Sequence, residues 1–152
     1  MSEVPPDQAY RVEVITLPVS DVDKALDFYT RQAGFSLDVD YHPVSGFRVV
    51  QLTPPGSACS VQLGEGLTDA APGSARATYL VVPDIEAACR GLTARGVHVS
   101  GFRHKDPVAN WTGNWAPGLD PARRDYASAA DFADPDGNTW IVQEIGYRAE
   151  GA

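Results

Sequence analysis

The sequence is poor in cysteine, with Cys59 and Cys89 as the only two among 152 residues. One falls in a predicted strand and the other in a predicted helix, and two such residues form neither a disulfide framework nor a zinc motif. We expect two buried thiols in a reducing, cytoplasmic compartment. There is no run of about 18 apolar residues and no basic segment followed by an apolar one at the start, so we expect no membrane span and no secretory signal.

Basic residues are also scarce. Twelve Lys and Arg stand against twenty Asp and Glu, which gives a formal net charge of −8. The basic residues are scattered along the chain instead of forming one stripe, so nucleic acid and anionic membranes are poor partners. A small neutral or cationic molecule suits this composition better.

Several motifs of catalysis are missing. No Gly-rich phosphate loop follows a strand, no nucleophile elbow occurs, and no Cys-x-x-Cys pair is present. Each of these motifs supplies a specific reactive geometry. Their absence argues against nucleotide-dependent and acyl-enzyme chemistry.

An internal repeat is the main feature that the sequence does contain. Residues 17–25 (LPVSDVDKA) and 80–88 (LVVPDIEAA) lie 63 positions apart, and in each an apolar segment ends before an Asp and a helix-forming run. A repeat of about half the chain length is typical of one small unit that is copied and paired, because such a unit cannot bury its apolar face alone. We expect a site where the copies meet.

Hydrophobic periodicity and turn residues divide each copy into elements of the same kinds. Ser20 and Asp23 form a variant of the capping box before the first helix, and Asp84 can cap the second. In the first copy we predict a strand over 11–19, a helix over 22–32 and strands over 35–41, 47–52 and 58–63. In the second we predict a strand over 75–82, a helix from Asp84 to Arg95, and strands over 97–103, 128–133 and 139–145.

Two segments have no period. Residues 64–74 are rich in Gly, Asp, Ala and Pro and are predicted to be a linker. Residues 104–127 form a 24-residue insertion in the second copy, and a loop of this length in a compact domain is more often functional than not.

With these motifs the chain resembles the vicinal oxygen chelate superfamily, which includes glyoxalase I, extradiol dioxygenases, fosfomycin-resistance enzymes and bleomycin-resistance binding proteins. The resemblance is carried by residues 19–29 (VSDVDKALDFY), 33–35 (AGF), 82–84 (VPD) and 132–145 (FADPDGNTWIVQEI). It implies an α+β fold of two βαβββ modules whose curved mixed sheets enclose a cavity, often completed by a homodimer. We place one domain at 10–147, with modules at about 10–63 and 75–147 and flexible termini at 1–9 and 148–152.

The resemblance also implies where metal ligands would stand. Metal-using members carry them on inward faces of the first and last strands of each module, which the repeat places at Val14, Gln62, Ala77 and Glu144. A catalytic divalent site needs about three protein ligands. Val14 and Ala77 have no lone pair to offer, so we expect no cofactor, with a divalent metal at Glu144 and Gln62 as the minor alternative.

Glu144 has two interpretations. Val142 and Trp140 flank it on its own face, so an inward Glu144 would be a carboxylate in apolar surroundings, suited to general acid or base catalysis. It could equally be a structural carboxylate satisfied by a hydroxyl or an Arg. Gln62 either hydrogen-bonds Glu144 across the pseudo-twofold axis or contacts the ligand directly.

Trp111 and Trp115 stand four apart in a polar, Gly-containing part of the insertion. They either stack on a planar or cyclic ligand or pin the loop to the sheet or to a partner subunit. Tyr79 and Thr16 alternate onto the faces of Ala77 and Val14 and are expected to line the cavity. Trp140 and Tyr126 complete the candidate ligand-binding residues.

Other residues fit ordinary structural roles. Arg123 and Arg124 are interpreted as solvated side chains of an exposed turn. Phe28 and Tyr29 belong to the apolar stripe of the first helix and are expected in the core.

The sequence leads to two hypotheses of different classes. The first is a metal-free protein that binds a small, partly aromatic or cyclic molecule, such as an antibiotic or secondary metabolite, as a homodimer. The second is a lyase, isomerase or cyclase that uses Glu144 as acid or base, or as a metal ligand.

Overall fold

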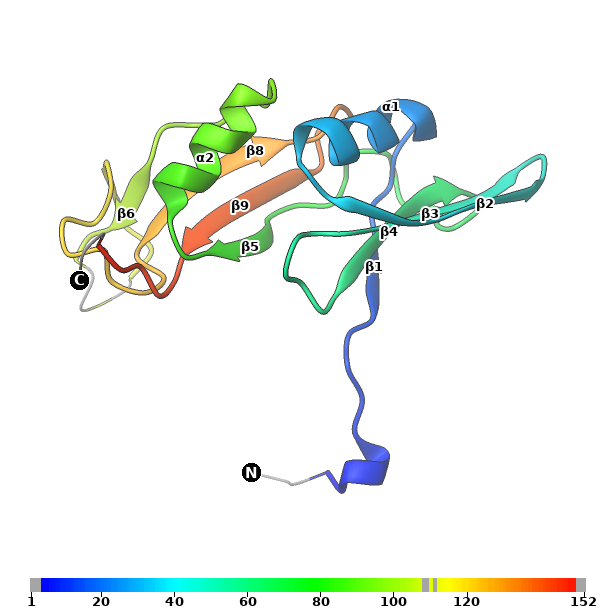
Figure 1. Ribbon diagram of the computed structural model, residues 1–152. Coiled ribbons are helices and arrows are strands. Elements are labelled where there is room, and N and C mark those ends of the chain that lie inside the picture. Colours follow the sequence, from blue (N-terminus) through cyan, green and yellow to red (C-terminus); the bar gives the residue numbers. More distant parts are fainter. Residues whose placement is uncertain (1–3, 108–109, 111, 150–152) are drawn as a thin grey trace.

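The computed structural model describes residues 4–107, 110 and 112–149. These residues form two mixed β-sheets, and the two α-helices lie on the same side of them (Figure 1). No described segment closes either sheet into a barrel, because each sheet ends in two edge strands. The α+β class and the fold predicted from the sequence are confirmed.

The first sheet has the strand order β1-β4-β3-β2, with β1 parallel to β4 and the other pairs antiparallel. Its helix, α1, continues into a short π-helical turn before the chain returns to the sheet. The elements of this half are β1 (Val14–Thr16), α1 (Val22–Asp27), the π-helical turn (Phe28–Gln32), β2 (Ser36–Val44), β3 (Phe47–Thr53) and β4 (Ser60–Glu65).

The second sheet has the order β5-β9-β8-β6-β7 and repeats the same plan, with β5 parallel to β9. Helix α2 begins where the Asp84 side chain accepts a hydrogen bond of 3.0 Å from the Ala87 backbone N–H, as the sequence predicts. The elements of this half are β5 (Thr78–Val82), α2 (Ile85–Ala94), β6 (Arg103–Lys105), β7 (Trp115–Pro117), β8 (Ser128–Ala133) and β9 (Thr139–Glu144).

Several local predictions differ from the structure: β1 and β5 are shorter than the strands predicted over 11–19 and 75–82, and three further differences concern a cap, a strand and the insertion. The cap of α1 is Asp21, whose carboxylate accepts from the Lys24 backbone N–H, while Ser20 donates to Asp136 instead. The strand predicted over 97–103 begins only at Arg103, as β6, because residues 97–102 form no ladder although Ser100 donates a backbone hydrogen bond to the Asp131 carbonyl of β8. The insertion contains a strand, β7, which pairs with β6 at the sheet edge.

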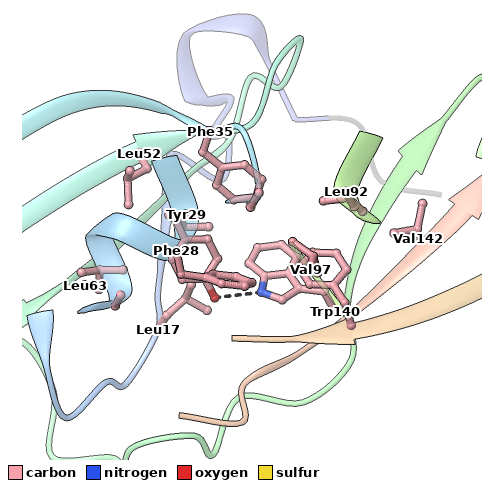
Figure 2. Close-up of a cluster of buried hydrophobic side chains, with 14 of the residues drawn as sticks. Leu17, Phe28, Tyr29, Phe35, Leu52, Leu63, Leu92, Val97, Trp140 and Val142 are labelled. Atoms are coloured by element: carbon pink, nitrogen blue, oxygen red, sulfur yellow. Dashed lines mark hydrogen bonds between the residues drawn. The ribbon is translucent and has the colours of Figure 1, made fainter. Parts of the chain in front are cut away.

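One hydrophobic core joins the two halves. Phe28 and Tyr29 of the π-helical turn are both buried there, as predicted. Tyr29 packs against Trp140 of the second sheet (Figure 2), and the centre of the Phe28 ring lies 6.3 Å from that of Phe132. The Phe132 and Trp140 rings stack with centroids 6.1 Å apart. Aromatic burial across this junction therefore holds the first helix against the second sheet.

A buried polar network crosses the same junction. Trp140 Nε1 donates to Tyr29 Oη at 2.9 Å, drawn as the dashed line in Figure 2, and Tyr29 donates to Asp134 at 2.8 Å. Asn138 donates to Asp134 and to the Pro18 carbonyl. Burial and the neighbouring Asp134 carboxylate raise the pKa of Tyr29 well above its usual range, so the phenol stays protonated.

No helix within the described part of the chain is both long and apolar enough to cross a membrane.

Candidate functional site: the open face of the sheets

The side of both sheets that lies away from α1 and α2 is called the open face here. Side chains alternate between the two sides of a strand, so residues two apart share a face. Along β5, Leu80 and Val82 pack toward the core, while Tyr79 and Val81 are each 56% exposed on the other side. The helices lie above the sheets in Figure 1, and no described helix covers the opposite side.

In the first sheet, a row of paired residues crosses the open face. Its members occupy matching register positions on all four strands and are Thr16, Gln62, Gln51 and Val39. Gln62 Nε2 donates to Thr16 Oγ1 at 2.8 Å. The structure thus places Gln62, Thr16 and Val14 on this face, although Gln62 bonds Thr16 and not Glu144.

In the second sheet, a similar row crosses five strands. Its members are Val81, Gln143, Ala129, Arg103 and Pro117. Four interstrand spacings of about 4.8 Å make this row about 19 Å wide. Gln143 and Ala129 in the middle of the row are buried, so its accessible surface lies toward the edge strands.

Aromatic side chains stand on both edges of this second sheet. Tyr79 lies on β5 at one edge, and Trp115, 42% exposed, lies on β7 at the other. Tyr126 is also exposed, and its backbone carbonyl accepts a hydrogen bond from Gln143 Nε2. The prediction for Trp111 falls outside the described residues.

Arg103 occupies the middle of an interaction chain on the open face. Its guanidinium makes two hydrogen bonds to the Asp131 carboxylate, at 2.6 and 3.1 Å, and its Cζ lies 4.6 Å from the centre of the Trp115 ring. Neither Arg103 nor Asp131 was singled out from the sequence. The two residues lie 28 positions apart in the sequence, and they meet because β6 pairs with β8, which no local pattern predicts. Alternation within residues 128–133 indicates only that Asp131 shares a face with Ala129.

Glu144 lies on the other side of the sheet, and its expected inward position is wrong. It is fully buried, and both its oxygens accept hydrogen bonds from Arg123, at 2.8 and 2.6 Å. One of them also accepts from the Ile85 N–H, the first residue of α2. The carboxylate therefore fits the structural interpretation, satisfied by an Arg and by a helix N-terminus.

The prediction that Trp140 belongs to the ligand-binding residues is also wrong, because Trp140 is buried in the core on the helix side of the sheet. The cause is a register error of three residues. Thr16 pairs with Gln62, and its counterpart 63 positions later, Tyr79, pairs with Ile141. Ile141 is therefore the equivalent of Gln62, and an odd shift along a strand exchanges its two faces.

Arg123 is the anchor of the insertion, and the interpretation of its side chain as solvated is also wrong. The side chain is 14% exposed and pairs with Glu144 and with Glu86 at 2.9 Å. Its Cζ lies 3.7 Å from the centre of the Tyr147 ring. The hydrogen bonds to Glu144 raise the pKa of Arg123, so this end of the insertion is tied to α2 and β9 by a permanent charge. Arg124, more than half exposed, fits the prediction better.

The donor chemistry of the four family metal positions does not fit a metal ion. With Ile141 in place of Glu144, the set offers one side-chain oxygen, that of Gln62, while Val14, Ala77 and Ile141 offer none. Ala77 precedes β5 with a positive φ of 57°. Within the described residues, no three His, Cys, Asp or Glu side chains gather closely enough to bind a metal.

Several hollows lie among the described residues, and two of them lie beside the sheets at the places described next. One of about 350 Å³ is lined by Thr16, by 17–19 and by 64–70 at the junction with the linker. The other, about 700 Å³, lies between α2 and residues 99–102, away from the open face. The first adjoins the Thr16–Gln62 pair and extends the candidate site toward the linker.

Comparison with known proteins agrees with this fold. Residues 11–142 match the sequence profile of the Glyoxalase/Bleomycin resistance protein/Dioxygenase superfamily. No curated protein sequence matches the chain.

Several solved structures share the fold. TnmS3, an antibiotic binding protein from Streptomyces sp. CB03234, is 32% identical over 90% of this chain and 96% of its own, with a TM-score of 0.67. A glyoxalase/bleomycin resistance protein from the same organism is also 32% identical, over 88% of this chain and 99% of its own, with a TM-score of 0.64. A superfamily member from Sphaerobacter thermophilus DSM 20745 is 30% identical, over 90% and 98%, with a TM-score of 0.66.

Proposed function

Since the chain belongs to the Glyoxalase/Bleomycin resistance protein/Dioxygenase superfamily, we propose that it binds a small, partly aromatic or cyclic molecule on the open face without a metal ion. An antibiotic or another secondary metabolite is the class of ligand in view. The observation that carries the proposal is the exposure of Tyr79, Val81 and Trp115 on one sheet surface. Exposed apolar and aromatic surface of this kind marks binding sites.

The relationship to TnmS3 supports this choice of ligand. That protein is an antibiotic binding protein, and it aligns with nearly the whole of this chain. Within one superfamily the fold hosts both binding and catalysis, so the site must decide between them. Here Tyr79 and Trp115 are exposed on the two edge strands of the second sheet, and their aromatic surface suits capture of a ring system.

The metal-free part of the proposal depends on donor chemistry. Val14, Ala77 and Ile141 cannot coordinate a cation, and Gln62 Nε2 donates to Thr16, so the Gln62 amide oxygen is the one donor atom that the four side chains offer. One amide oxygen makes a very weak site for Zn, Ni, Fe or Mn. Recognition is therefore assigned to stacking, hydrogen bonds and burial of apolar surface.

A second copy of the chain is proposed to complete the cavity. The open face of the first sheet also exposes Val39 and Tyr41, and residues before β1 expose Tyr10 and Val12 on a segment that extends away from the body (Figure 1). A single copy leaves these apolar surfaces in water, at a cost of about 25 cal/mol per Å² relative to burial. Pairing of two open faces would cover them and enclose a ligand between sheets.

Glu144 is poorly placed to act as the acid or base of an enzyme. Both oxygens of Glu144 are occupied behind the sheet, and no proton could pass from them to a ligand on the open face without breaking the pairs with Arg123. A general acid or base must come within hydrogen-bond reach of the group on which it acts. Sequestration is therefore the function that the site supports best.

A binding assay with product analysis tests the proposal. Aromatic microbial metabolites are titrated by calorimetry into the wild type, Tyr79→Ala and Trp115→Ala, with Arg31→Ala on the helix side as the matched surface control. We expect at least one metabolite to bind the wild type and the control equally, to bind both aromatic variants at least tenfold more weakly, and to be recovered unchanged by mass spectrometry. Conversion of the ligand, or unchanged affinity in both variants, would contradict it.

A further inference from the structure

Trp115 and Arg103 form a group on the open face that can only donate hydrogen bonds. The guanidinium carries five N–H groups and the indole one, and neither side chain has an acceptor. Two of the guanidinium N–H groups are used by Asp131. Within the described part of the chain, neither Arg103 Nε–H nor Trp115 Nε1–H donates to a protein acceptor.

Asp131 and Ser100 fix the position of the Arg103 guanidinium. Asp131 accepts from Arg103 through both oxygens, and its backbone N–H donates to Ser100 Oγ at 2.8 Å. The Ser100 N–H in turn donates to the Asp131 carbonyl at 2.9 Å. A bidentate pair on a paired strand has little rotamer freedom left to lose on binding, so its remaining donors are preorganised.

Two cationic side chains lie near the exposed indole. Arg103 Cζ lies 4.6 Å from the centre of the Trp115 ring, and Lys105 Nζ lies 6.0 Å from it. A cationic ligand placed against this ring would meet two like charges, which disfavours it. The net charge of −8 favours cationic or neutral ligands for the chain as a whole, whereas the side chains nearest this ring are the cations Arg103 and Lys105.

We propose that Arg103 and Trp115 form a subsite for an aromatic ring that bears an oxygen acceptor, in the form of a carboxylate, an ionised hydroxyl or a carbonyl. The ring packs against the exposed edge of Trp115, and its oxygen accepts from the free N–H groups of Arg103. The inference rests on the proposed function and narrows its ligand class to acceptor-bearing, neutral or anionic aromatics. Asp131 acts as a positioning residue.

Three naphthalene probes that differ in one substituent test the proposal. They are 2-naphthoate, 2-naphthylmethanol and 2-naphthylmethylammonium, which carry an anionic acceptor, a neutral hydroxyl and a cationic donor. Each is titrated into the full chain by calorimetry or by NMR. We expect 2-naphthoate to bind most tightly and the ammonium most weakly.

Substitutions test whether Arg103 causes the preference for the anionic probe. Arg103→Gln should weaken 2-naphthoate about tenfold or more, as expected for loss of a hydrogen bond to a charged group, and should not weaken the ammonium, because the substitution removes a like charge. Arg31→Gln, on the helix side, is the matched control and should change neither. Asp131→Asn keeps Arg103 but loses one of the two acceptor oxygens that position it, so it should weaken 2-naphthoate binding less than Arg103→Gln does, and thermal melts confirm that each variant is folded.

The outcomes are distinguishable from failure of the proposed function. Equal affinity for the three probes, preference for the ammonium, or an Arg103→Gln variant that binds 2-naphthoate like the wild type overturns the subsite. In each case binding of aromatic molecules on the open face stands. Absence of binding by every probe at millimolar concentration overturns both.

Discussion

Trp140 and Tyr29 come from opposite halves of the chain and share a hydrogen bond of 2.9 Å between Trp140 Nε1 and Tyr29 Oη. The Tyr29 hydroxyl in turn donates a hydrogen bond to Asp134, in the turn before β9. The two modules are therefore joined by a buried polar contact inside an aromatic cluster (Figure 2). Such networks are sensitive to the loss of one member, because the partners that remain are left without hydrogen bonds.

Tyr29→Phe removes the hydroxyl and leaves Trp140 Nε1 without an acceptor. We expect the free energy of unfolding to fall by about 1–3 kcal/mol, the cost of an unsatisfied buried polar group. Urea denaturation followed by tryptophan fluorescence measures it. A loss below about 0.5 kcal/mol, the range of ordinary surface substitutions, would show that the network contributes little.

Tyr29 should also make stability depend on alkaline pH. Its pKa is raised in the folded state, so only the unfolded chain releases this proton near pH 10. The contribution of Tyr29 is fully present below that pH, and stability falls by about 1.4 kcal/mol per pH unit above it. Burial raises the pKa of Cys89 to about 11, which acts in the same direction. The difference in slope between the wild type and Tyr29→Phe isolates the tyrosine, and equal slopes would contradict the prediction.

Arg123→Met leaves Glu144 as a buried carboxylate without its charge partner. We expect a loss of about 3–5 kcal/mol, typical of breaking a buried pair. The double variant Arg123→Met with Glu144→Leu removes both charges and should recover most of that stability. Denaturant titration of the single and double variants measures the coupling, and additive losses would show that the two residues act independently.

Gly73, in the linker, lies against the turn between β8 and β9, where there is no space for a side chain. Its φ is +79°, and an added Cβ would lie 2.0 Å from the Asp136 carbonyl oxygen. Gly46 has a similar φ of +87° but open space around it. We expect Gly46→Ala to cost about 1 kcal/mol for its backbone conformation, and Gly73→Ala to cost a further 1–3 kcal/mol or so for the clash. Melting temperatures of the two variants test this, and equal values would contradict it.

The metal-free proposal has its own measurement. Elemental analysis of protein purified without chelator should find Zn, Ni, Fe, Mn and Co far below one ion per chain. Added EDTA should leave the melting temperature unchanged, because a ligand that binds only the folded state would have stabilised it. A stoichiometric metal, or a melting temperature that EDTA lowers, would overturn the proposal.

Local patterns predicted most of the fold. Alternation located β8 and β9 within one residue, and Asp84 was identified as the α2 cap, because these signals depend on neighbours in the sequence. The faces of β9 were assigned wrongly because they depend on pairing with β5, which sequence spacing alone does not fix. The error of three residues placed Glu144 and Trp140 on the open face.

The residues of the open face also divide into those that the sequence pattern predicts and those that depend on long-range strand pairing. Gln62, Thr16 and Tyr79 were predicted there from the repeat, and the structure places them there. Arg103 and Asp131 were missed, because their association requires β6 to lie beside β8. Long-range strand order carries this information, and a single sequence does not display it.

The alternation of β5 and β9 has a consequence for how such a protein diversifies. Leu80 and Val142 maintain the fold, while Tyr79 and Ile141, one position away, face outward. Substitutions at the outward positions can change what is recognised with little cost to stability, so new specificities are accessible by single steps. A combinatorial library restricted to outward positions of these strands should yield mostly folded proteins, which makes the sheet a natural scaffold for evolving new binders.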